Sequence, residues 1–205
     1  MKRLTALVLS LLLLISIFPN AVGAPKSDGK IIVVDAGHGG YDGGAVYEGI
    51  CEKDINLSVA KLLRSELEER GYRVIMTRET DKYIKLRNRA YIANRADADL
   101  FISLHANAAS NAPYFAGVYT YRCPGSSKGL KLANAIQSQV CGETAAVDRG
   151  VLSEYFTVLY ASSMPAVLVE MGFMSNHNEL QNLIDPLYQD KIAKGIARGV
   201  DNYFS

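Results

Sequence analysis

Apolar runs and amphipathic segments alternate along most of the chain. Runs rich in β-branched residues predict buried strands, and apolar residues three or four positions apart predict helices that bury one face. The predicted strands are residues 30–35, 72–77, 100–104, 117–122 and 166–169. The predicted helices are residues 52–70, 86–96, 129–140 and 186–203. This alternation is typical of a single α/β domain, with a mostly parallel, twisted sheet and helices on both faces.

Local signals mark where two of these helices end or begin. Gly71 follows the last turn of the first helix, in the place where a left-handed glycine ends many helices. Asp185 and Pro186 form a capping pair that begins the last helix. In the second helix, Leu86 is among the positions that the apolar spacing turns toward the core.

Residues 1–23 are typical of a secretory signal peptide. A basic start precedes an apolar run over 4–18 and a small-residue site that ends at Gly23. The run is shorter than the ~20 apolar residues of a spanning helix, which favours cleavage over retention as a membrane anchor. The mature chain then has a short lead-in, 24–29, and one domain, 30–205. We expect secretion to the cell wall, the periplasm or the extracellular medium.

The charges of the chain are nearly balanced, with a formal net charge of +1 and no basic stripe. This argues against a nucleic-acid partner, because such proteins cluster their basic residues. The chain has three cysteines, an odd number for a secreted protein. One disulfide and one free thiol fit this number, with Cys123 and Cys141 as the preferred pair. There is no CxxC pair in the sequence to support a cysteine zinc cluster.

Polar side chains capable of chemistry follow three of the apolar strands. His38 follows the first strand within a glycine-rich loop, His105 follows the third, and Glu170 follows the last. In open α/β sheets the ligand crevice lies at the carboxyl ends of the strands, so these side chains are expected to converge. Two histidines and a carboxylate are a common catalytic zinc set, with an open fourth position for water. Glu48, Glu52 and Glu170 are all candidates for the carboxylate.

Simpler interpretations exist for each of these residues. A single histidine at a strand end is more often a hydrogen-bonded structural residue than a metal ligand. Glu52 begins a helix and can turn toward His38, but acidic residues also occur there because they interact with the helix dipole. The glycine loop, 37–44, lacks the GK[ST] of a P-loop and the spacing of a dinucleotide-binding loop. Cys51 as a nucleophile needs an electropositive environment, which the adjacent Glu52 opposes.

Six ordered motifs bear on the choice between these interpretations. They are DAGHGGYDGGA (35–45), EKDINL (52–57), TRETD (77–81), LRNRAYIAN (86–94), ADLFISLHANA (98–108) and PAVLVEMGFMSN (165–176). Together they resemble the zinc-dependent N-acetylmuramoyl-L-alanine amidases of the type 3 catalytic domain family. The resemblance implies cleavage of the amide between the lactyl group of N-acetylmuramic acid and the L-alanine of the peptidoglycan stem peptide. It also implies one Zn²⁺ per chain on His38, Glu52 and His105, with Glu170 as the catalytic residue.

The resemblance carries expectations about access and partners. Family members often have a basic residue where Tyr160 stands, which leaves the contacts to the substrate peptide open. Some relatives carry an inserted helix that covers the zinc site, and this chain is too compact for one, so open access is expected. The expected partner is peptidoglycan, bound by a monomer. Two alternatives remain, a zinc exopeptidase-like hydrolase of another peptide and a non-catalytic peptidoglycan-binding relative.

Several further polar residues are expected to support the site or the fold. Three of them either orient metal ligands or serve as turn and cap residues, namely Asp35, Asn107 and Asn176. His177 is interpreted as a capping or surface residue. Four residues at family positions are expected to join the second strand to the next helix through ion pairs, namely Arg78, Asp81, Arg87 and Arg89.

Overall fold

A computed structural model describes residues 29–205 of the chain. The predicted signal peptide, 1–23, and all but the last residue of the lead-in lie outside these residues. None of the helices in the described part combines the length and the apolar character that crossing a bilayer requires.

Within residues 29–205, six strands form one sheet in the order β4-β1-β5-β8-β6-β7. The strands are β1 (Ile31–Ala36), β4 (Arg73–Met76), β5 (Leu100–Asn107), β6 (Val118–Arg122), β7 (Asp148–Ser153) and β8 (Ala166–Phe173). Neighbouring strands pair in parallel, except that β6 and β8 pair antiparallel. Two short strands, β2 (Val46–Tyr47) and β3 (Ile50–Cys51), form a separate hairpin. The predicted mostly parallel sheet is therefore confirmed.

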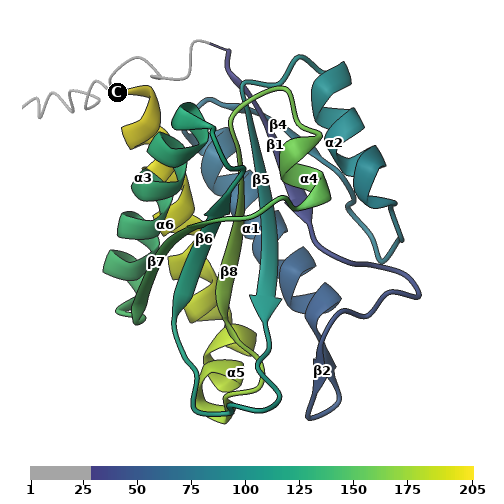
Figure 1. Cartoon of the computed structure of the whole chain (residues 1–205), viewed down its shortest axis with the longest axis vertical. Helices are drawn as coiled ribbons and strands as arrows, with labels where there is room; N and C mark the ends of the chain where they lie inside the picture. Colours follow the sequence, from purple (N-terminus) through teal and green to yellow (C-terminus); the bar gives the residue numbers. More distant parts are fainter. Residues whose placement is uncertain (1–28) are drawn as a thin grey trace, which may run out of the picture.

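Helices cover both faces of the sheet, as predicted (Figure 1). One face carries α1 (Glu52–Glu69), α3 (Ser127–Thr144) and α6 (Pro186–Phe204). The other face carries α2 (Leu86–Arg95) and the single-turn α4 (Thr157–Tyr160). A further helix, α5 (His177–Ile184), lies beyond the carboxyl end of β8. The Asp185 side chain accepts a hydrogen bond from the Leu187 amide at the start of α6, which is the predicted cap.

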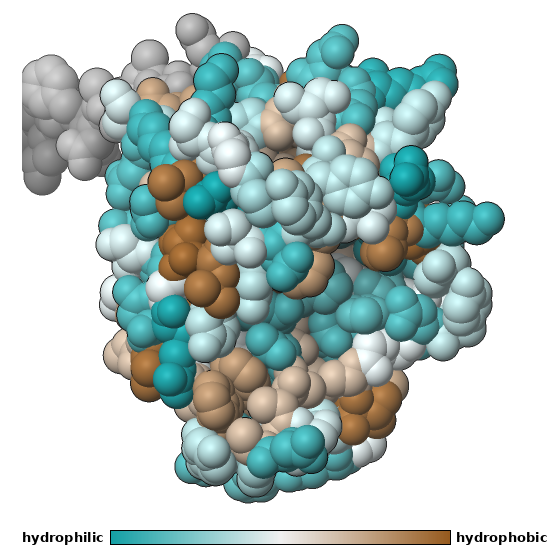
Figure 2. Space-filling model, viewed as in Figure 1, coloured by the Kyte–Doolittle hydropathy of each residue, from teal (hydrophilic) through white to brown (hydrophobic). Residues whose placement is uncertain are grey.

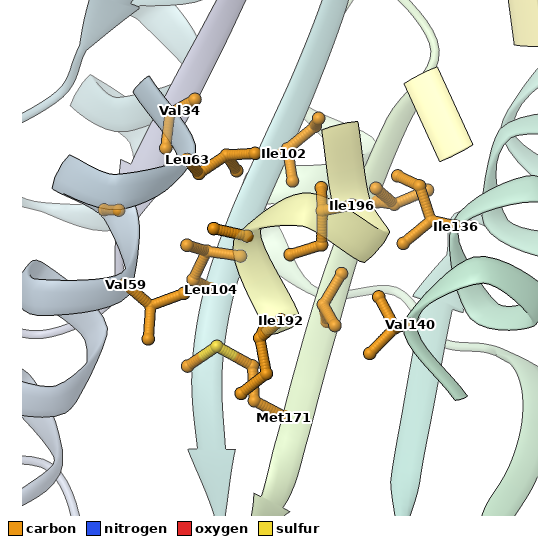
Figure 3. Close-up of a cluster of buried hydrophobic side chains, with 14 of the residues drawn as sticks. Val34, Val59, Leu63, Ile102, Leu104, Ile136, Val140, Met171, Ile192 and Ile196 are labelled. Atoms are coloured by element: carbon orange, nitrogen blue, oxygen red, sulfur yellow. The ribbon is translucent and has the colours of Figure 1, made fainter. Parts of the chain in front are cut away.

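The larger hydrophobic core lies between the sheet and the helices α1, α3 and α6 (Figure 3). Ile102 and Leu104 of β5 meet Leu63 of α1 and Ile196 of α6, and all four side chains are fully buried. A smaller core on the other face joins β-strand residues such as Phe101 to α2 and α4. Both faces of the parallel strands are thus apolar, which explains their continuous apolar runs.

Five short elements are absent from the predicted set, namely β2, β3, β7, α4 and α5, and one predicted orientation is wrong. β7 is a half-polar edge strand and α4 is a single turn, so neither produces a periodic apolar pattern long enough to recognise. Leu86 does not turn into the core, because its side chain is 55% exposed and lines a cavity at the carboxyl side of the sheet.

The preferred disulfide is also wrong, because Cys51, Cys123 and Cys141 are all free thiols. Cys123 packs against the smaller core, whereas Cys141 on α3 packs against the larger core. The two residues therefore lie on opposite faces of the sheet, which prevents the close approach that a disulfide requires.

Candidate metal centre

Four of the predicted site residues meet at the carboxyl ends of the central strands. His38 follows β1, His105 lies near the end of β5, and Glu52 is the first residue of α1. Glu170 of β8 is the register partner of His105 on β5. The sequence separates these residues widely, and the parallel sheet brings them to one edge, as expected for an open α/β sheet.

The Glu52 carboxylate lies between the two imidazole rings. Its Oε2 is 3.2 Å from His38 Nε2, and its Oε1 is 2.9 Å from His105 Nδ1. Ligand atoms from the three residues all lie within 4.8 Å of one another. A second carboxylate, that of Asp42, lies 2.9 Å from the other ring nitrogen of His38, Nδ1. This contact orients the His38 ring so that Nε2 faces Glu52.

Mutual contacts decide the charges of this cluster. Burial acts to raise the pKa of Glu52, but hydrogen bonds with His105 and His38 lower the pKa of that carboxyl well below its ordinary range. Burial acts to lower the pKa of His38, but its contacts with Glu52 and Asp42 raise that pKa above the usual value. A negative carboxylate is thus held against two imidazoles, and a cation bound there would replace the imidazole protons.

Glycines leave the space that the cluster needs. A Cβ atom at Gly37 would lie 2.4 Å from atoms of the His105 ring, and one at Gly44 would lie 2.5 Å from Glu52 Oε2. Two imidazoles and one carboxylate in this arrangement fit a borderline metal such as Zn²⁺, which takes nitrogen and oxygen ligands together. His38, Glu52 and His105 are the residues that would hold the ion.

Buried arginines fix the backbone of the glycine loop. Arg89 donates hydrogen bonds to the carbonyls of Ala36 (2.6 Å) and His38 (2.7 Å). Arg78 donates to Ala36 (2.9 Å) and Gly37 (2.9 Å). His38 has a φ of 59°, a left-handed conformation that a non-glycine residue rarely adopts without support. These arginines therefore position His38, whereas the sequence had predicted that they join β4 to α2.

Loss of one partner from the buried ion pair between Arg89 and Asp35 is expected to destabilise the fold strongly. The two atoms Arg89 Nη1 and Asp35 Oδ1 lie 2.9 Å apart, and both side chains are almost inaccessible. Arg89→Ala would leave Asp35 without its counter-charge and should lower the free energy of unfolding by about 3–5 kcal/mol. Urea denaturation measures this. As a control, Arg64→Ala removes a solvent-exposed pair with Glu79 and should change stability by no more than about 1 kcal/mol. Equal effects of the two changes would contradict this interpretation.

Glu170 lies beside the cluster in a different environment. Its Oε2 atom is buried and has no hydrogen-bond partner among the described residues. Burial, together with the charge of Glu52, raises the pKa of Glu170 to about 7 although His105 opposes the shift. Glu170, His38 and His105 face one cavity of about 320 Å³, whose apolar walls include Leu86 and Phe156. A carboxyl group with this pKa can both accept and donate a proton near neutral pH.

Other residues named from the sequence lie outside this cluster. Glu48, the competing carboxylate, is 2.7 Å from His177 Nδ1 at the start of α5. Asn176 caps α5, and the Asn107 side chain accepts a hydrogen bond from the neighbouring Ala108 amide. Asp35 accepts hydrogen bonds from Thr77, Arg89 and Ser103, so it supports the loop backbone and contacts neither histidine.

Two residues that contact the cluster were not identified from the sequence. Asp42 bonds the His38 ring, and Asn56 Nδ2 donates to Glu52 Oε1 over 3.1 Å. The available signals were short spacings, since Asp42 is four positions after His38 and Asn56 is one helical turn after Glu52.

Tyr160 stands at the position where the resemblance led us to expect a basic residue. Its hydroxyl accepts a hydrogen bond from Arg87.

Comparison with known proteins places the chain in a family. Residues 32–202 match the family model described as N-acetylmuramoyl-L-alanine amidase. The chain belongs to this family. The predicted membership of the N-acetylmuramoyl-L-alanine amidase family is therefore confirmed, and the chain is a cell wall amidase.

Individual relatives extend over most of the domain. The uncharacterized protein YqiI of Bacillus subtilis (strain 168) is 37% identical over 197 residues, which are 94% of this chain and 93% of that protein. The N-acetylmuramoyl-L-alanine amidase LytC of the same organism is 37% identical over 86% of this chain, which spans 36% of LytC. The crystal structure of an N-acetylmuramoyl-L-alanine amidase from Clostridium difficile 630 has 38% identity and a TM-score of 0.84, over 86% of this chain and 97% of that one.

Proposed function

We propose that the chain is a zinc-dependent amidase that hydrolyses the bond between the lactyl group of N-acetylmuramic acid and the L-alanine of the peptidoglycan stem peptide. The observation that carries this proposal is the convergence of His38, Glu52 and His105 beside the buried Oε2 of Glu170, facing one cavity. This arrangement supplies a metal site and a proton-transfer group for one reaction. Membership of the amidase family indicates which bond that reaction cleaves.

In the proposed mechanism, His38, Glu52 and His105 would hold one Zn²⁺. When bound there, the ion would supply a lowered pKa of water, toward ~7, and polarisation of a carbonyl oxygen. Glu170 accepts the proton of the attacking water at its carboxylate and donates that proton to the departing alanine nitrogen. Burial of the Glu170 carboxyl acts to raise its pKa, which favours the second step, because the group must be a base first and an acid afterwards.

The setting of the reaction is part of the proposal. Residues 1–23 direct secretion, and the domain over 30–205 acts as a monomer on peptidoglycan in the cell wall, the periplasm or the extracellular medium. The near balance of charge, a formal +1, supports recognition of the substrate by shape and local chemistry instead of bulk electrostatics.

Removal of the metal should abolish activity. In a gel that contains peptidoglycan, the purified chain should produce a zone of clearing, lose it with a chelator, and regain it when Zn²⁺ is added, because the residual protein groups cannot activate water alone. Clearing that persists in metal-free protein would contradict the proposal. Binding without clearing in the zinc-loaded protein would favour the non-catalytic alternative.

A further inference from the structure

A continuous row of six aromatic rings extends from the cavity across β6. In order, the row contains Phe156, Tyr121, Tyr119, Phe173, Phe115 and Tyr114. Neighbouring ring centroids lie between 5.1 Å (Phe156 and Tyr121) and 6.2 Å (Tyr119 and Phe173) apart. We call this set the aromatic row. Its Phe156 end lines the cavity that contains Glu170, and its far end is Tyr114, whose side chain is 77% exposed.

One end of the aromatic row, Phe156 and Tyr121, packs against the smaller core beside α4, and the row then continues onto a part of the sheet that no helix covers within the described chain. Thr120 of β6 points to the other face, where it bonds Gln137 of α3, so Tyr119 and Tyr121 point away from α3. Figure 1 shows the lower parts of β6 and β8 in front of α6, with no helix in front of them. Figure 2 presents the same face, which is hollowed below α4.

One residue of the aromatic row also pairs with Glu170, the candidate catalytic residue, across strands β6 and β8. Tyr119 is the direct antiparallel partner of Glu170, so the two side chains stand next to each other on one face of the sheet. A polymer that placed its scissile bond at Glu170 would therefore extend over Tyr119 and along the row. The row is half-buried at Tyr119 and Tyr121, buried at Phe173 and exposed at Tyr114.

The chemistry of the aromatic row suits sugar rings. None of its six residues is charged, and three of them carry hydroxyl groups. Phe173 is buried and the Arg149 guanidinium lies over the Phe115 ring at 5.2 Å, so the ring surfaces open to a ligand are chiefly those of Tyr119 and Tyr114. Sugars of the glycan strand are uncharged when the muramic lactyl group is in amide linkage, and their C–H faces can stack on aromatic rings. A stem peptide carries free carboxylates, which the exposed Lys85 and Arg87, the sequence neighbours of the cavity-lining Leu86, match better.

We propose that the aromatic row is the binding site for the glycan strand, and that it holds the N-acetylated sugars next to the muramic acid whose amide is cleaved. This inference rests on the proposed function, because it takes the position of the scissile bond from it. It predicts that the enzyme prefers long glycan strands over a single muramoyl peptide, and that the preference resides in Tyr119 and Tyr114.

The test compares two substrates that carry the same stem peptide, one with a single muramic acid and one with a glycan strand of several disaccharides. Tyr119→Leu and Tyr114→Ala should each lower kcat/KM on the long strand by about tenfold, because each removes a stacking surface. Tyr114→Ala should leave kcat/KM on the single-sugar substrate unchanged, because Tyr114 lies at the end of the row away from Glu170. Tyr119→Leu should lower the long-strand value more than the single-sugar value, because Tyr119 also lies beside Glu170. Tyr119→Phe keeps the ring and should retain the long-strand rate. Tyr91→Leu, an exposed tyrosine on α2, is the matched control and should leave both rates unchanged.

The outcomes separate this inference from the function it rests on. If the wild-type protein cleaves neither substrate, the proposed function fails and the inference with it. If the wild type cleaves both and the variants lose neither rate, or lose both equally, the aromatic row does not bind glycan. A loss that follows the length of the stem peptide instead of the glycan would assign the row to the peptide and overturn the inference. Wild-type digestion of long strands should also be inhibited by N-acetylglucosamine oligomers, and that of Tyr119→Leu much less so.

Discussion

Glu170→Gln is expected to lower kcat on peptidoglycan by about 10²–10⁴-fold and to leave the zinc content unchanged. Glutamine keeps the size of the side chain and cannot take a proton from water at neutral pH. Because Oε2 has no hydrogen-bond partner among the described residues, the change breaks no protein contact at that atom and should fold normally. The measurement is the rate at which stem peptides are released from purified sacculi, together with elemental analysis for zinc.

Glu179→Gln is the matched control for this change. The Glu179 carboxylate is also partly buried, but it accepts hydrogen bonds from the Gly117 and Phe173 amides and does not line the cavity. Its replacement should reduce stability without a comparable fall in kcat of the folded protein. If Glu170→Gln released stem peptides at the wild-type rate, the assignment of proton transfer to Glu170 would be wrong.

His105→Ala should bring the zinc content from about one ion per chain to near zero, and abolish turnover with it. Only His38 and Glu52 would remain of the proposed ligands, and two protein ligands hold Zn²⁺ far less tightly than three. His177→Ala is the control, because His177 is exposed, pairs with Glu48 and lies outside the cluster. It should retain full zinc. A His105→Ala protein that kept one tightly bound zinc ion would contradict the proposed ligand set.

The sequence predicted the strand ends because their pattern is strong. His38, His105 and Glu170 each follow a run of apolar residues, and the rule that ligands bind at the carboxyl ends of parallel strands placed them together. Residue spacing alone did not separate Glu52 from Glu48. The structure shows why they differ: Glu48 has a φ of 51° in the two-residue turn of the β2–β3 hairpin, which directs it to His177.

Other features depend on contacts between distant segments and leave little local signal. The loop-fixing role of Arg78 and Arg89 requires knowing that backbone carbonyls of the glycine loop lie against β4 and α2. The preferred Cys123–Cys141 pair was wrong because sequence distance does not reveal which face of the sheet a residue occupies. The single turn of α4 is too short for periodicity to reveal, although Phe156 at its start lines the cavity.

The most direct test of the proposed function is mass spectrometry of the products that the zinc-loaded chain releases from purified sacculi. The expected products are peptides with free L-alanine amino termini, and glycan strands whose muramic acid carries a free lactyl carboxyl group. Neither product is expected to form with the Glu170→Gln protein. New amino termini within the stem peptide, or new reducing ends in the glycan, would place the cleaved bond elsewhere and contradict the account.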